Sequence, residues 1–526
     1  MSTLKNLLGK LPYTAELYWY LRQRNEPTTV GMNLTNLASM LPDWVNEAHT
    51  NRHTNFEPKK VVVFGMMRYW IEHIALLGTA LAGMGHKVTL LYLPFDGWKE
   101  EIHSFDLRRQ NVYIREMLRP LEPLVTVKSL LDVFPTEDLP NDFRAQLIPR
   151  ARYDTQYSLL REEIDPESDL YKLRAQRNHD AAQRAFTYLT KNRPDVVITP
   201  NGSILEFGVM FATASYLNIP ISTYEFGEQD QRIWMAQNAD VMKQDTSALW
   251  NTVKDIPFAD EQFNAIQTLF ASRKKPLLFD NFARQWQGTA PKGGTAIREQ
   301  LGLDDRPLAL IPANVLGDSL TLGRDIFAGL TEWLRETIRY FIEHPQFQLA
   351  IRVHPGEGIG WGISVYDILR ETFPELPENI RLLPADAKVN TYDLVEAAEV
   401  GLVYTTTVGM EMAMTGKPVV VVGQTHYRGK GFTLDPTSWD EYWQIVGDAL
   451  ANPDTFAPPP EKVRLAWKYA YYFFYHYPQK FPWHLYHYEK HLPTESVAYI
   501  LSDNGQEKYG HTFRYLLGEP IAWGKN

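Results

Sequence analysis

The chain has 526 residues, of which 44% are hydrophobic and 22% are charged, and this composition is typical of a globular protein with more than one hydrophobic core. Its formal net charge of −10 argues against a general nucleic-acid-binding surface, because such surfaces concentrate positive charge. The absence of cysteine excludes disulfides, thiolate catalysis and cysteine-ligated zinc, and agrees with a reducing compartment.

The first 55 residues or so are expected to be helical. Lys5, Lys10 and Pro12 interrupt their apolar residues, so the pattern is not that of a signal peptide. No stretch of the chain reaches the roughly 18 uninterrupted apolar residues that a transmembrane helix needs. We therefore expect a cytoplasmic protein.

A first α/β domain is expected to begin at Lys59. A strand from that residue, a helix over Trp70–Met84 and a strand over Lys87–Leu93 predict a β-α-β unit with a parallel strand pair. The first turn lacks the G-x-G-x-x-G pattern, which argues against a dinucleotide cofactor such as NAD. Residues from about 100 to 190 are rich in Arg, Glu, Leu and Tyr, so we expect an inserted group of helices there.

Polar residues follow a later strand of this domain. The runs DVVIT (195–199) and IPISTY (219–224) are expected strands, separated by a helix that begins near Ser203. Asn201 and Ser203 lie between the first of these strands and the helix. They are candidate ligand-binding residues, for the acceptor if the protein catalyses a group transfer. A helix-capping role alone would also explain Ser203.

Two carboxylates follow the second of these strands. Glu225 is the candidate general base, because a hydroxyl nucleophile needs a proton acceptor within hydrogen-bond reach. Glu228 is a rival for this role and a candidate acceptor-binding residue. The sequence leaves the choice between the two open, and an ordinary surface carboxylate is the alternative.

A second α/β domain is expected after the text PKGGT. A buried strand over Leu308–Pro312 leads to Asn314, which we expect to face a cleft. Asn314 is a candidate ligand-binding residue, for the donor if the protein catalyses a group transfer. A long helix, Ile326–His344, then leads to a strand over Gln348–Val353. This strand delivers His354 at its carboxyl end, where ligands of open α/β sheets collect.

Three threonines follow the next expected strand, Val400–Tyr404. The hydroxyl and N–H groups of Thr405, Thr406 and Thr407 would stand at the start of a helix over Val408–Thr415, which suits a phosphate. The alternative is a β-branched run that only fills a strand, but the apolar strand is already complete before it.

The loop GQTHYRGKGFTLDP after Val422 is cationic and rich in glycine. Arg428 offers a planar fork, and Lys430 a point charge, to a phosphate or a sugar carboxylate. A mobile exposed loop is the alternative. The spacing of its glycines and lysine is not that of a P-loop, so ATP hydrolysis is disfavoured.

Motifs that hold metal ions are absent from the sequence. Aspartate never recurs at a spacing of two, and the fourteen histidines form no H-E-x-x-H or other compact set. We therefore expect a metal-independent reaction with no cofactor.

The motifs between Arg352 and Pro436 resemble the capsule polysaccharide biosynthesis family of bacterial glycosyltransferases. This family includes Kdo transferases and is distantly similar to bacterial sialyltransferases with a His-Pro motif. In that group the histidine and a Ser/Thr cluster hold the donor phosphate, which implies this role for His354 and Thr405–Thr407. The segment EMAMTGKP has the spacing E-x4-G-x-P, which implies that Glu411 binds a ribose of the donor; a solvated helix residue is the alternative.

The sialyltransferase-like relatives also carry an acidic-acidic-Gly motif whose carboxylate acts as general base. Here Phe226 replaces the middle acidic residue, which leaves Glu225 in that position. The resemblance covers about the last third of the chain, and the first 290 residues agree with it only in general layout.

The resemblance implies a GT-B type fold, with two Rossmann-like, doubly wound domains that face a cleft. Residues 1–290 would form the acceptor domain, with its helical insertion at about 100–190, and residues 291–460 the nucleotide-sugar donor domain. The aromatic, helical tail 461–526 would pack back on the first domain. Peripheral contact of this tail with the inner face of a membrane, near a lipid-linked acceptor, is the alternative.

The implied function is transfer of a sugar from a nucleotide-activated donor to a hydroxyl of a surface or capsular glycan. CMP-Kdo or CMP-sialic acid is the favoured donor, and UDP- and GDP-sugars stay open. A nucleotide-sugar epimerase, a polyol-phosphate transferase and a non-catalytic glycan-binding or assembly subunit are the alternatives. The sequence does not determine the stereochemical outcome or the oligomeric state.

Overall fold

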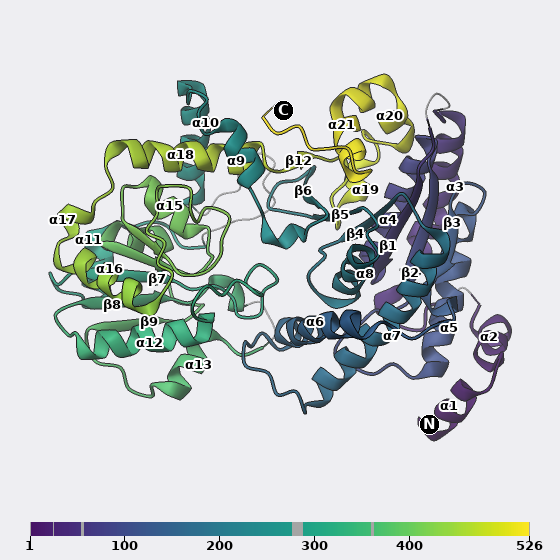
Figure 1. The fold of residues 1–526 in the computed structure, drawn as a ribbon, viewed down its shortest axis with the longest axis horizontal. Helices are drawn as coiled ribbons and strands as arrows, with labels where there is room; N and C mark the ends of the chain where they lie inside the picture. Colours follow the sequence, from purple (N-terminus) through teal and green to yellow (C-terminus); the bar gives the residue numbers. More distant parts are fainter. Residues whose placement is uncertain (1, 25, 54–56, 276–287, 359–361, 525–526) are drawn as a thin grey trace. The chain divides into compact units, whose positions relative to one another are not determined.

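The chain folds into two compact units, each built on an open, mostly parallel sheet (Figure 1). The computed structural model describes residues 2–24, 26–53, 57–275, 288–358 and 362–524. Unit 1 comprises residues 1–155, 165–242 and 479–521, and unit 2 comprises residues 156–164, 243–478 and 522–526. The predicted α/β class with doubly wound sheets is confirmed.

Seven strands form the sheet of unit 1, in the order β12-β6-β5-β4-β1-β2-β3. Strands β1 to β5 are parallel, whereas β6 is antiparallel to β5 and β12 is antiparallel to β6. Because β2 and β3 lie on one side of β1 while β4 and β5 lie on the other, the topological switch point falls between β1 and β4. The strands are β1 (Lys60–Met66), β2 (Lys87–Leu93), β3 (Thr126–Ser129), β4 (Val196–Pro200), β5 (Ile221–Glu225), β6 (Arg232–Gln237) and β12 (Gln479–Lys480).

The helices of unit 1 pack around this sheet. In α4 every residue from Trp70 to Gly83 is buried, since this largely apolar helix lies between the sheet and α3. The helices are α1 (Ser2–Lys10), α2 (Thr14–Tyr18), α3 (Thr35–Thr50), α4 (Arg68–Gly83), α5 (Ser104–Leu118), α6 (Asn141–Leu159, whose last turn belongs to unit 2), α7 (Asp169–Asn192), α8 (Leu205–Tyr216), α19 (Tyr488–His491), α20 (Val497–Leu501) and α21 (Asp503–Leu516).

Five parallel strands form the sheet of unit 2, in the order β11-β10-β7-β8-β9. The strands are β7 (Leu308–Pro312), β8 (Gln348–Arg352), β9 (Ile380–Leu383), β10 (Val400–Val403) and β11 (Val419–Val421). The helices are α9 (Ser247–Val253), α10 (Asp260–Arg273), α11 (Gly294–Leu301), α12 (Leu330–Glu343), α13 (Val365–Thr372), α14 (Thr391–Ala397), α15 (Val408–Met414), α16 (Trp439–Ala451), α17 (Pro453–Phe456) and α18 (Pro460–Tyr475).

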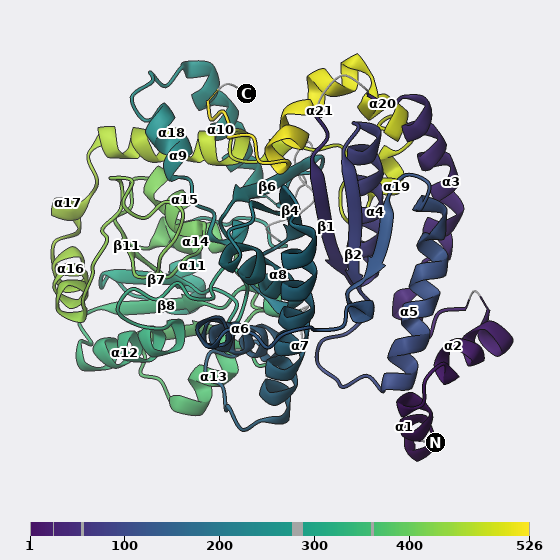
Figure 2. The same cartoon turned by 45° about the vertical axis from the view of Figure 1, so that its right-hand side comes forward.

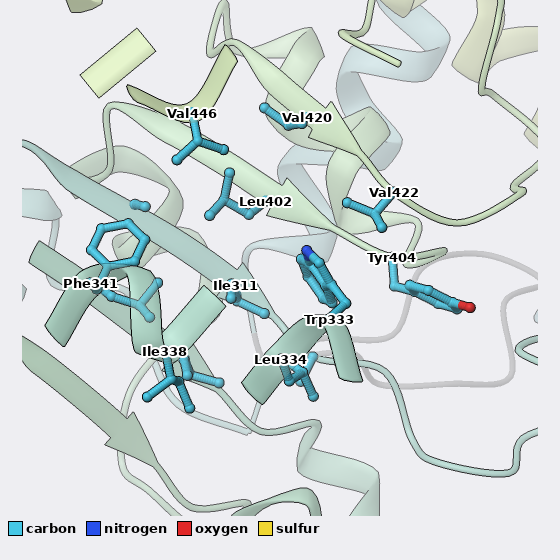
Figure 3. Packing of buried hydrophobic residues seen from close by; sticks show 14 of the residues in the cluster. Ile311, Trp333, Leu334, Ile338, Phe341, Leu402, Tyr404, Val420, Val422 and Val446 are labelled. Carbon is cyan, nitrogen blue, oxygen red and sulfur yellow. The ribbon is translucent and has the colours of Figure 1, made fainter. Parts of the chain in front are cut away.

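Aliphatic strand residues and the indole of Trp333 form the core on one face of this sheet (Figure 3). Leu402 and Val420 come from neighbouring strands, and both are fully buried together with Val446 of α16. Burial of each such side chain is worth about 1.5–3 kcal/mol. The core therefore fixes β7, β10 and β11 in place and supports the loops that follow them.

The boundaries of the two units differ from the expected domain limits at residues 290 and 460. Residues 243–275 belong to unit 2 because α10 packs on α18, and the Asn390 side chain donates to the Lys274 carbonyl at 3.0 Å. The expected helical insertion at about 100–190 contains α5, α6 and α7, but also the strand β3. Helix α18 of the tail lies in unit 2, whereas residues 479–521 complete unit 1 through β12.

Candidate active site

The carboxyl edge of the unit 2 sheet gathers several of the predicted donor-binding residues. Strands β8 and β9 lie on one side of β7, and β10 and β11 lie on the other, so the switch point falls between β7 and β10. Asn314 follows β7 and Thr405 follows β10. The Thr405 N–H donates to Asn314 Oδ1 at 3.2 Å, so the structure brings these two residues together at the switch point.

The hydroxyl of Thr405 has an unusual environment. The residue is 9% exposed, and among the residues that the structure describes its Oγ1 finds no hydrogen-bond partner. Its carbonyl is engaged, because Thr425 Oγ1 donates to it at 3.1 Å. A buried hydroxyl without a partner costs free energy, and such groups recur where a ligand supplies the missing bond.

The other two threonines are half-buried and lead into α15. The Tyr427 hydroxyl donates to the Thr406 carbonyl at 2.6 Å, and Thr406 Oγ1 accepts from the Val408 N–H at 3.4 Å. Thr407 precedes the first residue of α15 and makes no side-chain cap. A Cβ added to Gly409 would collide with the Tyr427 hydroxyl, so only glycine fits this turn of α15.

His354 stands two residues beyond β8 at the same edge of the sheet. Its side chain is exposed, and Nδ1 accepts from the Gly356 N–H at 3.0 Å. This bond places the proton of a neutral imidazole on Nε2, which becomes a donor. Strand β8 pairs with β7, so His354 and Asn314 follow neighbouring parallel strands.

Two of the predicted acceptor-binding residues of unit 1, Asn201 and Ser203, contact each other beyond the end of β4, and Asn201 also contacts the candidate base at the end of the neighbouring strand β5. Asn201 Oδ1 accepts from the Ser203 N–H at 3.0 Å and from the Ser203 hydroxyl at 2.7 Å, and Asn201 Nδ2 donates to Glu225 Oε2 at 3.2 Å. Asn201 has φ +58° and Gly202 has φ +89°, the left-handed region that favours Asn and Gly. The side-chain amide of Asn201 therefore links the Ser203 hydroxyl to Glu225, the candidate base.

Ser203 does not cap α8, so the alternative prediction of a helix-capping role for this residue is wrong. Ile204 occupies the N-cap position, and the Leu205 N–H donates to a carboxylate oxygen of Asp154. Arg150 donates to the carbonyls of Gly202 and Ser203 at 3.1 and 2.9 Å and holds this turn. Glu228 is partly exposed and lies in the turn between β5 and β6.

Residues 286–452 match the family model described as Capsule polysaccharide biosynthesis protein. This part of the chain is similar to that family. The match covers about a third of the chain and includes all the predicted donor-binding residues and His354. The match agrees with the family resemblance of the sequence motifs, and the two open, mostly parallel sheets agree with the fold class that this resemblance implies.

No curated protein matches the chain. Three solved structures illustrate what the chain is similar to. KpsC of Thermosulfurimonas dismutans, a beta Kdo 2,4 transferase, is 16% identical with a TM-score of 0.35 over 52% of this chain and 78% of that one. The UDP-GlcNAc 2-epimerase from Neisseria meningitidis is 13% identical with a TM-score of 0.24 over 78% and 95%. The sucrose-phosphate synthase from Thermosynechococcus elongatus is 13% identical with a TM-score of 0.28 over 78% and 95%. Likenesses at this level say nothing of donor or acceptor.

Glu411 of unit 2 lies in an internal network. It is 1% exposed; Oε1 lies 2.6 Å from Arg273 Nε, and Oε2 accepts from the Tyr392 hydroxyl at 2.8 Å. Burial, followed by the charge of Glu411, raises the pKa of the Tyr392 phenol well above its ordinary value. The network explains Glu411 without a ligand, so contact with a ribose stays a prediction, and the solvated-helix alternative is wrong.

Arg428 and Lys430 make contacts within unit 2. Arg428 donates to the carbonyls of Val421, Asp435 and Pro436, the second at 2.9 Å, so its planar fork holds its own loop. Lys430 Nζ donates to Ser247 Oγ at 3.3 Å, and burial lowers the pKa of the lysine. The loop is anchored, so the alternative of a mobile exposed loop does not describe it. A donor-binding role stays a prediction for both residues.

Sequence reasoning missed Met67, Arg150 and Arg273. Met67 follows β1 with φ +62° and ψ 149°, a region populated almost only by glycine, and no sequence pattern signals such a residue. The two arginines are distant in sequence from the groups they hold. Within the described part of the chain, no group of three or more His, Asp or Glu side chains is arranged to hold a metal ion. Metal independence stays a prediction.

Proposed function

We propose that this protein is a glycosyltransferase that binds a nucleotide-activated sugar at the carboxyl edge of the unit 2 sheet. The observation that carries the proposal is the enclosed hydroxyl of Thr405, which lacks a partner among the described residues and stands beside Asn314 at the switch point. A phosphate oxygen of the donor would accept from this hydroxyl. The match to the capsule polysaccharide family supports this reaction class.

His354 would act on the departing phosphate. Its Nε2–H is a donor in the neutral ring, and donors aimed at an oxygen that gains charge in the transition state lower the barrier most. The proposed donor is a CMP-activated acidic sugar such as Kdo or sialic acid, with UDP- and GDP-sugars as the competing donors. The proposed acceptor is a hydroxyl of a capsular or surface glycan.

Glu225 would accept the proton of the acceptor hydroxyl. Its Oε2 is held by Asn201 Nδ2 at 3.2 Å, and the side chain is partly exposed at the end of β5. A general base must be oriented toward the proton that it accepts and must lie within hydrogen-bond reach of it. The hydrogen bond from the Asn201 amide orients the Glu225 carboxylate. Asn201 and Ser203, which are hydrogen-bonded to each other, would form part of the same acceptor site.

The test is a calorimetric titration of the protein with CMP, CDP, UDP and GDP, repeated with Thr405→Val and His354→Ala. Valine keeps the β-branched shape and removes only the hydroxyl. We expect selective CMP binding that weakens about 10- to 100-fold in Thr405→Val, the worth of a hydrogen bond to a charged group. Binding of CMP that is unchanged in both variants would place the nucleotide elsewhere.

Glu225→Gln is the matched control for this titration. It lies in unit 1, so nucleotide affinity should match that of the unchanged protein while sugar transfer to an added glycan falls by at least about 100-fold. Product analysis of the same reactions separates transfer from epimerisation of the donor sugar. Transfer that survives in Glu225→Gln would assign the base to another group, with Glu228 tested next.

A further inference from the structure

The amino-terminal segment, residues 2–24, is built from α1, α2 and the π-helical turn Trp19–Gln23. All three pack on α5 and lie apart from the sheet of unit 1 (Figure 2). Ala15, Trp19 and Gln23 are buried and are spaced four residues apart, so they form the inner face of this helical stretch. This face explains how the segment is held.

The opposite face of the segment is also apolar, although it is exposed. Tyr13, Leu17 and Leu21 repeat every four residues and are 73%, 58% and 76% exposed, and Leu7 and Leu11 precede them in the chain at 58% and 46%. Residues 7–30 contain eight of the fifteen exposed large hydrophobic residues in the described part of the chain. Such clustering marks an interaction surface, because isolated exposed hydrophobic residues scatter.

The charge of this segment is opposite to that of the whole protein. Lys10, Arg22 and Arg24 are exposed, and residues 2–24 carry a net charge of +3 in a chain of −10; Glu26, just beyond, reduces it to +2. Glu16 is the only acidic residue of the segment, and it is paired with Arg108 of α5. Asp106 of α5 is paired with Lys5 at 2.8 Å and with Arg109 at 3.0 Å.

We propose that residues 2–24 dock this protein on an anionic phospholipid surface. Leucine and tyrosine side chains would enter the boundary between headgroups and acyl chains, and the exposed cations would face the lipid phosphates. The charge argues against a second copy of the chain as the occupant, because two basic faces repel. This inference does not depend on the proposed reaction.

The aromatic tail, where membrane contact was the alternative expected from sequence, offers less exposed apolar surface: in the described part of the chain, Tyr486 is its one large hydrophobic residue that is exposed. Tyr469, Phe473 and Trp483 are at most 5% exposed and pack inside their respective units. His426 stacks on Phe473 with ring centroids 3.8 Å apart. The lipid-facing role therefore moves from the tail to the amino-terminal segment.

The experiment measures sedimentation of the full chain with vesicles of phosphatidylcholine, with and without phosphatidylglycerol. The surface variant is Leu17→Glu with Leu21→Glu. The matched control is Phe134→Glu with Ile148→Glu, which adds the same charge at exposed apolar residues elsewhere in unit 1, 80% and 61% exposed. A third variant, Lys10→Gln with Arg22→Gln and Arg24→Gln, removes the cations and keeps the apolar face.

We expect the unchanged chain and the control to bind the anionic vesicles, and the surface variant to bind at least about ten-fold more weakly. The cation variant should also bind more weakly and should lose most of its salt dependence. Absence of binding by the unchanged chain, or equal binding by the surface variant and the control, overturns the proposal. Self-association that the surface variant abolishes, without vesicle binding, overturns it in favour of a second copy. Circular dichroism establishes that each variant is folded.

Discussion

At the scale of single residues, Glu72 is a buried acid with incomplete compensation. Its side chain on α4 is largely buried, and its partners are the Tyr488 hydroxyl at 3.3 Å and Arg68, whose Nη1 lies 3.7 Å from Oε1. Burial raises the pKa of Glu72 to about 7, and the Arg68 charge opposes this only in part. The folded state therefore binds a proton that the unfolded state releases near pH 4.5.

This proton makes stability depend on pH. A carboxyl whose pKa is raised on folding stabilises the fold fully below its unfolded pKa, and that contribution is lost as pH rises from about 4.5 through about 7. In the unchanged protein, we expect Glu72 to lower the free energy of unfolding by about 1–3 kcal/mol between pH 5 and pH 8. Glu72→Gln should remove this loss, so the variant should gain about that much stability over the unchanged protein on going from pH 5 to pH 8. Urea unfolding at the two pH values measures it, with the exposed Glu122→Gln as control. The same pH dependence in Glu72→Gln and in the unchanged protein would contradict the assignment.

The buried pair between Glu411 and Arg273 joins two helices, α15 and α10. Removal of one partner from such a pair leaves a charge buried without compensation, which costs about 3–5 kcal/mol. We expect Glu411→Gln to lower the free energy of unfolding by about that amount, with nucleotide affinity little changed. Urea unfolding and the CMP titration measure the two effects.

The double variant Glu411→Met with Arg273→Met is the control for this prediction. It removes both charges and should recover much of the lost stability, because a well-packed apolar pair often replaces a buried ion pair without cost. If instead Glu411→Gln weakens nucleotide binding and leaves stability unchanged, the carboxylate contacts the ribose, as the family resemblance implies.

At the scale of elements, the buried central strands were predictable, whereas several short or partly exposed strands were not. β1, β4, β7 and β10 are buried throughout or nearly so, and such strands read as continuous apolar runs. The missed strands are short or partly exposed, so they do not read as continuous apolar runs: they are β3, β6, β9 and β12.

The candidate sites follow the same logic. Asn314, Thr405 and His354 were predictable because each directly follows a buried strand, and parallel strands bring such residues to one edge. The buried state of Glu411 was not predictable, since its partner Arg273 lies 138 residues earlier in the chain. Arg428 resembles a ligand-binding residue in sequence, and only the three-dimensional path of its loop shows that it binds backbone carbonyls.

At the scale of the whole molecule, unit 1 is completed by residues that follow unit 2 in sequence. β12 pairs with β6, and the segment beyond it buries Phe481, Trp483 and Phe513 in unit 1, each at most 1% exposed. The Trp483 indole donates to the Glu495 carbonyl at 2.8 Å, and α20 packs on α3 and α4. The core of unit 1 is therefore incomplete until the end of the chain has been added.

This organisation predicts that unit 1 depends on residues 479–521 for its stability. Trp483→Ala should lower the free energy of unfolding of unit 1 by about 3–5 kcal/mol, since it leaves a cavity in the core and an unpaired Glu495 carbonyl. Tyr486→Ala, at a residue 61% exposed, is the control and should change stability by less than about 1 kcal/mol. Limited proteolysis with mass spectrometry measures the stability of each unit separately. In a chain truncated after Pro478, we expect rapid cleavage in unit 1 between α4 and α8, whereas the strands from β7 to β11 of unit 2 should stay protected. Equal protection of α4 in the cut and full-length chains would show that unit 1 folds without its last strand and helices.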